Sequence, residues 1–250
     1  MTDPRTLAVL PLGATEQHGP HLPPETDCII AEAMAERVAG AVRDTIDVTI
    51  LPVERTGYSP EHASWPETRS RPFAEAAERW IGIGASLRER GTRRLLLLNA
   101  HGGNAPLMTI VATELRVRHA MLCVATSWTR HGDPASLVGD RERAMGIHAG
   151  LIETSVMLAL RPDLVRMERA ASWPSVQAQH EAADTLLRAY GPHAYGWAME
   201  DLNPCGAVGD ARGATAELGE RLIADAVAGL ATLARETARF DPPWFDDTGR

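Results

Sequence analysis

The sequence predicts an α/β fold in which helices cover both faces of a mostly parallel sheet, a three-layer α/β/α sandwich. Residues 6–12 form a short apolar run and residues 93–98 include four consecutive leucines, the pattern of strands buried on both faces. Segments with helical spacing separate such runs through the first half of the chain, as is typical of parallel sheets. The 250 residues show no break in composition, so we expect one domain spanning residues 1–250.

The first half of the chain alternates between strands and helices. After the first strand, Thr26 can cap a helix that ends near Gly40. Residues 57–72 hold three prolines and read as a long loop, a kind of segment that is usually functional. Further strands are predicted at residues 48–53 and 121–127, and further helices at residues 73–90 and 106–118.

The second half is predicted to be mainly helical. One helix runs from Gly146 to about Leu160, just before Pro162. A second lies around residues 177–190, and a glycine-rich, irregular run follows at residues 203–210. The last helix, residues 216–239, is amphipathic and is expected to pack on the core.

Composition and charge exclude several classes of protein. The formal net charge is -8, with acidic and basic residues interspersed, so no basic stripe is available for nucleic acid. No stretch of about 18 apolar residues occurs, and the N-terminus is polar, so we expect no membrane insertion or export and a cytoplasmic location. Cys28, Cys123 and Cys205 are few and far apart, which indicates free thiols in a reducing compartment.

A dense polar cluster follows the first predicted strand. Residues 13–27 include Glu16, His18 and Asp27 in a segment rich in glycine and proline. Carboxylate oxygen and imidazole nitrogen are the usual ligands of zinc and manganese, and such a loop can fold several of them onto one point. One such residue alone would usually be solvated, but their concentration beside a buried strand favours a metal site.

Two further clusters have the same character. His101 follows the second buried strand directly, and Gly102 and Gly103 leave room for a ligand there. The third cluster holds His148 and Glu153, five positions apart. That separation spans about one and a half helical turns, so we expect the two side chains to have different roles unless His148 precedes the helix.

These clusters resemble the motifs of the creatininase family. The family patterns are Glu-x-His-Gly-x-His followed by Thr-Asp, then Asn-x-His-x-x-Asn, then His-Ala-Gly-x-x-Glu-Thr-Ser, and all three occur here in order. Residues 57–62 and 206–210 are also similar to family segments. The resemblance implies a creatininase-like fold and a binuclear centre of two divalent ions per subunit. Zn²⁺ is favoured, and Mn²⁺ or Fe²⁺ is expected to be accepted at one position.

The resemblance also implies which residues bind the ions. Asp27 would bridge both, Glu16 and His101 would bind one, and His18 would bind the other. Creatininase itself has a glutamate where this chain has Gly103. We therefore expect the missing carboxylate to come from Glu153.

Other assignments concern the substrate and the proton. His148 resembles the catalytic histidine of the family and is the candidate to pass a proton to the leaving nitrogen, with a helix-capping or core role as the alternative. We expect His21 to hold a ligand or the loop. Ser59, Glu61 and His62, in the long loop, are candidates to line the substrate pocket.

The resemblance implies hydrolysis of a carbon–nitrogen bond in an amide or cyclic amide by a metal-activated water. The family includes creatinine amidohydrolases, a deformylase acting on a formamidopyrimidine nucleotide, and a peptidase that trims the mycofactocin precursor. Ala144 and Met145 replace a Trp-Asp pair of creatininase, which argues against creatinine as substrate. We expect a small-molecule amide as partner and a homo-oligomer, a hexamer by resemblance. The alternatives are a peptidase of the mycofactocin-precursor type and a metal- or nucleotide-binding relative without turnover.

Overall fold

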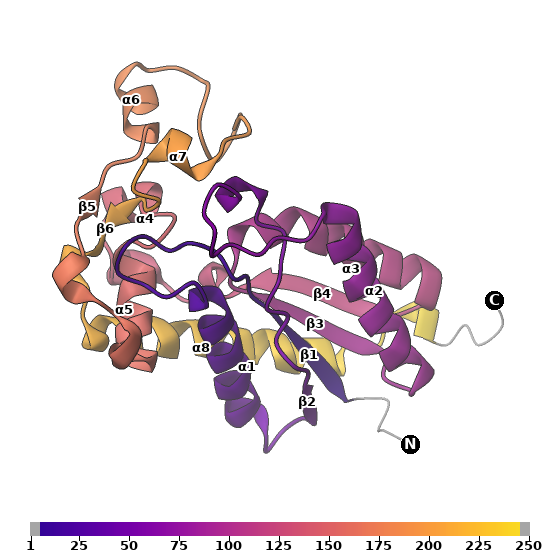
Figure 1. Ribbon diagram of the computed structural model, residues 1–250. Helices are drawn as coiled ribbons and strands as arrows, with labels where there is room; N and C mark the ends of the chain where they lie inside the picture. Colours follow the sequence, from indigo (N-terminus) through magenta and orange to yellow (C-terminus); the bar gives the residue numbers. More distant parts are fainter. Residues whose placement is uncertain (1–5, 246–250) are drawn as a thin grey trace.

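A four-stranded parallel sheet forms the centre of the protein in the computed structural model, which describes residues 6–245 (Figure 1). The strand order is β2-β1-β3-β4, and every neighbouring pair is parallel. The strands are β1 (Leu7–Leu12), β2 (Val48–Ile50), β3 (Arg94–Asn99) and β4 (Leu122–Ser127).

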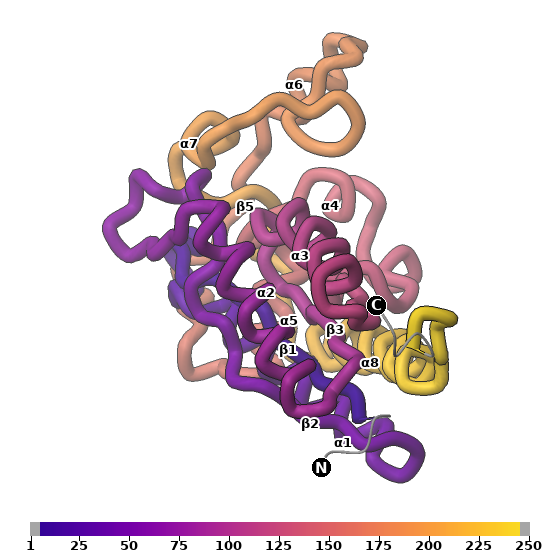
Figure 2. Tube along the Cα trace, turned by 90° about the vertical axis from the view of Figure 1, so that its right-hand side faces the viewer, coloured from indigo at the N-terminus to yellow at the C-terminus, as the bar shows by residue number. Residues whose placement is uncertain are grey.

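Helices cover both faces of this sheet and complete the predicted α/β/α sandwich (Figures 1 and 2). One layer consists of α1 (Thr26–Val42), α5 (Leu151–Leu160) and α8 (Ala216–Arg239). The other consists of α2 (Phe73–Glu89) and α3 (Ala105–His119). The predicted three-layer architecture is therefore confirmed.

The central strands β1 and β3 carry continuous apolar runs, Leu7–Leu12 and residues 95–98, because both of their faces are buried. Leu7 and Val9 of β1 enter the core beneath α1, α5 and α8, whereas Ala8, Leu10 and Leu12 enter the core beneath α2 and α3. Side chains alternate between the two faces of a strand, so a strand between two helix layers needs a continuous apolar run. The four leucines of β3 follow the same rule.

The remaining elements lie beside and above the sandwich. A two-stranded antiparallel sheet pairs β5 (Ser172–Trp173) with β6 (Gly209–Asp210), next to α4 (Asp140–Met145). The helices α6 (Gln177–Ala182) and α7 (Met199–Leu202) belong to a segment that projects from the sandwich, at the top of Figures 1 and 2. Single 3-10 turns occupy Pro60–His62, Gly102–Asn104, Trp128–Arg130, Pro134–Ser136, Pro162–Leu164, Met167–Arg169, Ala211–Gly213 and Pro243–Phe245.

Several predicted boundaries were wrong, each for a local reason. The second strand ends at Ile50 because Pro11, the next residue of β1 that would donate to it, has no N–H, and the pairing slips by one residue so that the N–H of Glu54 donates to the carbonyl of Pro11. The helix predicted around residues 177–190 ends at Ala182, and Asp184 adopts a left-handed conformation with φ of 51°. Thr26 is the first helical residue rather than the cap, and its hydroxyl donates to the carbonyl of Pro23.

The helix predicted from Gly146 begins only at Leu151. Ala149 has φ of 53° and Gly150 is extended, so neither can belong to a right-handed helix. The short helix α4 before it was not predicted. Within residues 6–245, no helix combines the length and the apolar character needed to cross a bilayer.

Candidate metal centre

The polar clusters come together at the carboxyl ends of β1 and β3. Leu12 pairs in register with Asn99, so the segments that follow the two strands leave the sheet side by side. Glu16 Oε1 lies 3.1 Å from Nδ1 of His101 as a result. This edge is where open parallel sheets place their ligands.

Asp27, in the first turn of α1, lies between two histidines. Its Oδ2 is 3.4 Å from Nδ1 of His101, and its Oδ1 is 3.3 Å from Nε2 of His18. Each carboxylate oxygen of Asp27 therefore faces a different imidazole. Glu153, in α5, joins this group, because one ligand atom each of His18, Asp27 and Glu153 lie within 4.8 Å of one another.

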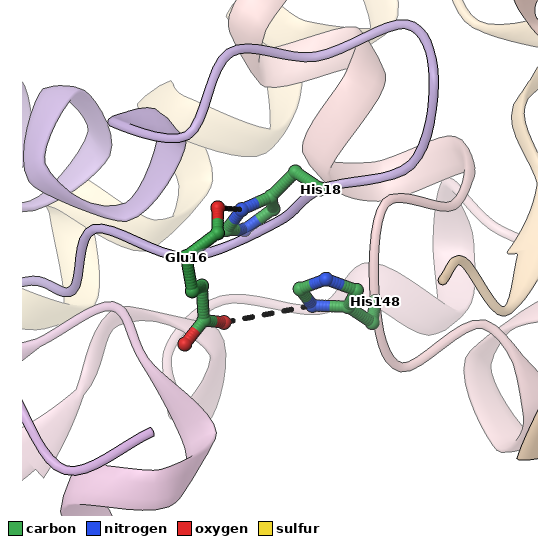
Figure 3. Close-up of side chains that lie close together, drawn as sticks. All are labelled: Glu16, His18 and His148. Carbon is green, nitrogen blue, oxygen red and sulfur yellow. Dashed lines mark hydrogen bonds and ion pairs between the residues drawn. The ribbon is translucent and has the colours of Figure 1, made fainter. Parts of the chain in front are cut away.

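His148 approaches the same cluster from the segment before α5. Its Nδ1 lies 3.8 Å from Oε1 of Glu16, and its ring centroid lies 4.3 Å from that of His18 (Figure 3). Ligand atoms of Glu16, His18 and His148 also lie within 4.8 Å of one another. Since His148 precedes the helix, it and Glu153 can both point inward despite their five-residue separation.

Backbone carbonyls fix which nitrogen of each imidazole is free. A carbonyl oxygen only accepts, so Nδ1 of His18 must donate to the carbonyl of Glu16 at 3.0 Å, and in the neutral imidazole Nε2 then carries the lone pair. By the same reasoning, Nε2 of His101 donates to the carbonyl of Tyr58 at 2.9 Å, and Nδ1 keeps the lone pair. In both histidines the free nitrogen faces Asp27.

The residues of this cluster fit divalent metal ions. Glu16, His18 and Asp27 are each 1% exposed, and His101 is 3% exposed. Glu16 Oε2, His18 Nε2 and Asp27 Oδ2 are buried without a hydrogen-bond partner. Buried polar atoms are almost always paired, so convergent unpaired carboxylate oxygens and an imidazole nitrogen are the donor set of a zinc or manganese site.

The electrostatics of the cluster also favour cations. Burial raises the pKa of the Glu16 carboxyl, but the imidazoles of His101, His62 and His18 outweigh it and hold that pKa well below its ordinary value. Burial lowers the pKa of His18, yet the carboxylate of Asp27 outweighs this and raises it to about 10. Burial raises the pKa of the Glu153 carboxyl to about 7. The buried carboxylates therefore require positive charge nearby, from protons or from metal ions.

The long loop of residues 57–72 brings its own side chains to the cluster. Ser59 Oγ lies 3.2 Å from Nε2 of His101, and Glu61 Oε1 lies 3.5 Å from the same atom. His62 is nearer the centre than the sequence indicated, because it is 2% exposed and its Nε2 lies 3.4 Å from Oε1 of Glu16. Its ring centroid is 4.4 Å from that of His148.

A cavity of about 420 Å³ opens above these residues. Its polar lining residues are Glu16, Glu61, His62, His101 and His148, with Gly102 and Gly103 beside His101. Its other lining residues include Tyr58, Pro106, Ile147, Trp197 and Met199. Trp197 and Met199 come from the projecting segment that carries α7, so this segment covers the cavity.

His21 and the two glycines have distinct surroundings. His21 is 1% exposed, its Nε2 lies 2.8 Å from Oγ1 of Thr154, and its ring stacks on Trp173. It ties the first loop to α5. At Gly103 an added Cβ would lie 2.5 Å from Nε2 of His101 and 2.7 Å from Oε1 of Glu61, whereas at Gly102 it would meet nothing within 4 Å.

Asn104 was not singled out from the sequence although it connects three loops. Its Nδ2 donates to the carbonyl of Gly13 at 3.1 Å and to Oδ1 of Asn99 at 3.1 Å, and its Oδ1 accepts from the N–H of Tyr58 at 3.0 Å. Its place at the end of the Asn-x-His-x-x-Asn pattern is the signal that could have identified it. Asn104 holds the segments bearing Glu16, His101 and Glu61 together.

The fold and the site define a metal-binding protein of the α/β/α class. The sequence model of the Creatininase family (creatinine amidohydrolase) matches residues 1–234. The chain belongs to the creatininase family, a family of hydrolases.

The named relatives span three activities: mycofactocin precursor peptide peptidase, creatinine amidohydrolase and 3-dehydro-scyllo-inosose hydrolase. The chain is 31% identical over 228 residues to the mycofactocin precursor peptide peptidase of Mycolicibacterium smegmatis, covering 90% of this chain and 83% of the relative. It is 32% identical over 184 residues to the creatinine amidohydrolase of Pseudomonas putida, covering 67% of this chain and 69% of the relative.

Solved structures agree with the family assignment. A putative creatinine amidohydrolase from Bacteroides fragilis superimposes with a TM-score of 0.80 at 28% identity, over 94% of this chain and 90% of that one. A manganese form of creatininase superimposes with a TM-score of 0.76 at 27% identity, over 94% and 92% of the two chains. A zinc–zinc form of a creatininase mutant gives 0.75 at 26% identity, with the same coverage.

Proposed function

We propose that this protein is a metal-dependent amidohydrolase that cleaves a carbon–nitrogen bond of a small amide or cyclic amide. The observation that carries the proposal is the arrangement of Asp27, whose two oxygens face the free nitrogens of His18 and His101. A carboxylate so placed is suited to joining two cations. The hydrolase names of the relatives support the reaction class.

The proposed ligands divide between two ions. Asp27 would bridge them, Glu16 and His101 would hold the first, and His18 and Glu153 would hold the second. Glu61 is the other carboxylate near His101, but it approaches Nε2, whose proton is already donated to Tyr58. Two divalent ions, with Zn²⁺ favoured and Mn²⁺ or Fe²⁺ acceptable at one position, would supply Lewis acidity and lower the pKa of water.

His148 is the proposed carrier of the proton that the leaving nitrogen requires. Its Nε2 donates to the carbonyl of Gln17 at 2.7 Å, so the ring is held in one orientation and Nδ1 keeps the lone pair. Burial, together with the neighbouring His18 and His62, holds the pKa of His148 well below its ordinary value, so the ring is neutral. A neutral imidazole can accept a proton at Nδ1 and pass it to the nitrogen that leaves.

The cavity supports a small-molecule substrate. Its volume of about 420 Å³ lies in the range of small-molecule sites. Its lining combines the polar groups of the candidate metal centre with apolar side chains, among them Trp197 and Met199. The scissile amide would lie against the polar groups and the rest of the substrate against the apolar side chains. Creatinine is not the proposed substrate, because Gly103 and Ala144–Met145 replace residues expected in creatininase.

A second candidate is a peptidase of the mycofactocin-precursor type. Similarity to such peptidases extends over 90% of this chain, against 67% for the creatinine amidohydrolase of Pseudomonas putida. A peptide would enter between the long loop and the segment bearing Trp197. We also propose a single domain, a cytoplasmic location and a homo-oligomer, hexameric as in the family, which light scattering would test.

The test is turnover by the purified, metal-loaded protein of three substrate sets: lactams and other cyclic amides, formamides, and short peptides. We expect hydrolysis within one set and its loss in Asp27→Asn. Asp44→Asn, at an exposed carboxylate, is the matched control and should behave as the parent. The proposal would be refuted by full activity in Asp27→Asn, or by a protein that binds no divalent metal.

A further inference from the structure

Glu142, in α4, has contacts that the proposed mechanism does not use. Its Oε1 accepts from the N–H of Leu151 at 2.9 Å, and its Oε2 accepts from the N–H of Asp210 at 2.9 Å. Leu151 begins α5 and Asp210 ends β6. One carboxylate thus joins α4 to the start of α5, 9 positions along the chain, and to β6, 68 positions along the chain.

The contacts of Glu142 lie close to a backbone bridge made by His148. The N–H of His148 donates to the carbonyl of Val208 at 3.3 Å, and the N–H of Val208 donates to the carbonyl of His148 at 2.8 Å. The two bonds of Glu142 lie within three residues of this bridge, at Leu151 of α5 and at Asp210 of β6. The bridge and the carboxylate together hold the segment between α4 and α5 against β6.

The packing around the carboxylate is close enough to require glycine. An added Cβ would lie 2.5 Å from Oε1 of Glu142 at Gly150 and 2.6 Å from it at Gly209, and closer still at Gly146. Gly209 also has φ of 136°, which side chains rarely allow. Three glycines therefore let the backbone close around one side chain.

We propose that Glu142 is a positioning residue that holds the segment of His148 in its working conformation; this rests on the proposed function. A carboxylate suits the task because each oxygen accepts from a different backbone N–H. A glutamine would turn an amide N–H toward one of those donors. The N–H of Leu151 is also one of the unpaired donors at the start of a helix, where negative charge is favourable.

Loss of Glu142 is not expected to unfold the protein. The side chain is half-buried and borders a cavity of about 380 Å³ that is also lined by Arg141, Ser172 and Ser175. Water can reach the freed N–H groups of Leu151 and Asp210 through this cavity, so they need not remain unpaired. The expected consequence is a looser segment around His148.

The experiment compares Glu142→Ala and Glu142→Gln with Asp140→Asn, which changes an exposed carboxylate of the same helix. We expect kcat to fall by about 10-fold to 100-fold in Glu142→Ala, less in Glu142→Gln, with KM within about threefold. Bound metal should be unchanged. Hydrogen exchange should accelerate in residues 146–151 and near residues 208–210, but not in the central strands. Asp140→Asn should match the parent.

A double variant decides whether Glu142 acts through His148. If it does, Glu142→Ala added to His148→Ala should lower kcat no further, since coupled residues are not additive. Parent-like kcat in Glu142→Ala, a full additive loss in the double variant, or loss of metal together with protection throughout the fold would each overturn the proposal. If the parent itself hydrolyses no amide, the proposed function fails, and local hydrogen exchange still tests whether Glu142 holds the segment.

Discussion

Glu16 Oε1 lies 3.1 Å from Nδ1 of His101, although the two residues follow different strands. The contact exists because β1 and β3 pair in parallel register and end together at Leu12 and Asn99. Strand pairing therefore brings together two residues of the candidate metal centre, and α1 adds Asp27 from its first turn.

Metal removal should lower the stability of the protein. Ions that bind only the folded state stabilise it, by about 2.7 kcal/mol at a concentration 100 times Kd. Chelation should therefore lower Tm by roughly 5–10 °C in a chain of this size. Differential scanning calorimetry with and without Zn²⁺ measures the shift. An unchanged Tm after complete chelation would contradict a metal centre in the core.

Glu153→Gln should remove about one of two bound ions, because Glu153 is the carboxylate placed beside His18 and Asp27. Glu61→Gln should retain both ions, since Glu61 approaches the nitrogen of His101 that donates to Tyr58. Elemental analysis of the two purified variants gives the comparison. The reverse pattern would transfer the ligand role to Glu61.

His148→Ala should keep its metal and lose turnover. A positioned proton carrier contributes typically 10²-fold to 10⁴-fold, so we expect kcat to fall by about 10²-fold or more. Steady-state kinetics and metal content are measured on the same preparation. If metal is lost with activity, His148 is instead a ligand, as its distance to Glu16 permits.

Gly103→Ala should lower the free energy of unfolding of the protein, whereas Gly102→Ala should leave it unchanged. A Cβ at Gly103 would press on His101 and Glu61, but a Cβ at Gly102 faces open space. We expect a loss of about 1–3 kcal/mol for Gly103→Ala from overpacking. Urea unfolding and metal titration of both variants provide the measurement. Equal stabilities would show that the loop of residues 57–72 moves aside freely.

The thiols should differ in reactivity. All three cysteines are free, Cys205 is exposed and Cys28 is buried. Burial raises the pKa of the Cys123 thiol to about 12, so it is protonated at pH 8 and reacts only as pH approaches that value or as the protein unfolds. A thiol assay at pH 8 should titrate one group in the native protein and three in denaturant. Rapid reaction of two native thiols would contradict this.

The sheet was predictable because its signal is local. A strand buried on both faces needs an unbroken apolar run, and residues 6–12 and 93–98 carry one. The boundary at Ile50 and the late start of α5 were missed, because the missing N–H of Pro11 in the neighbouring strand and the left-handed Ala149 act through backbone geometry that hydrophobic periodicity does not report.

The sequence alone determined the alternation of strands and helices and the candidate metal-binding residues, since both depend on residue types at fixed spacings. Only the tertiary structure decided which atoms face one another. His62 contacts Glu16, and a Cβ at Gly103 would press on Glu61. Glu142 accepts from the N–H of Asp210. Each of these contacts joins parts of the chain that meet only after packing. Such contacts have no local signature, because they arise when parallel strands and their connecting loops end at one edge of the sheet.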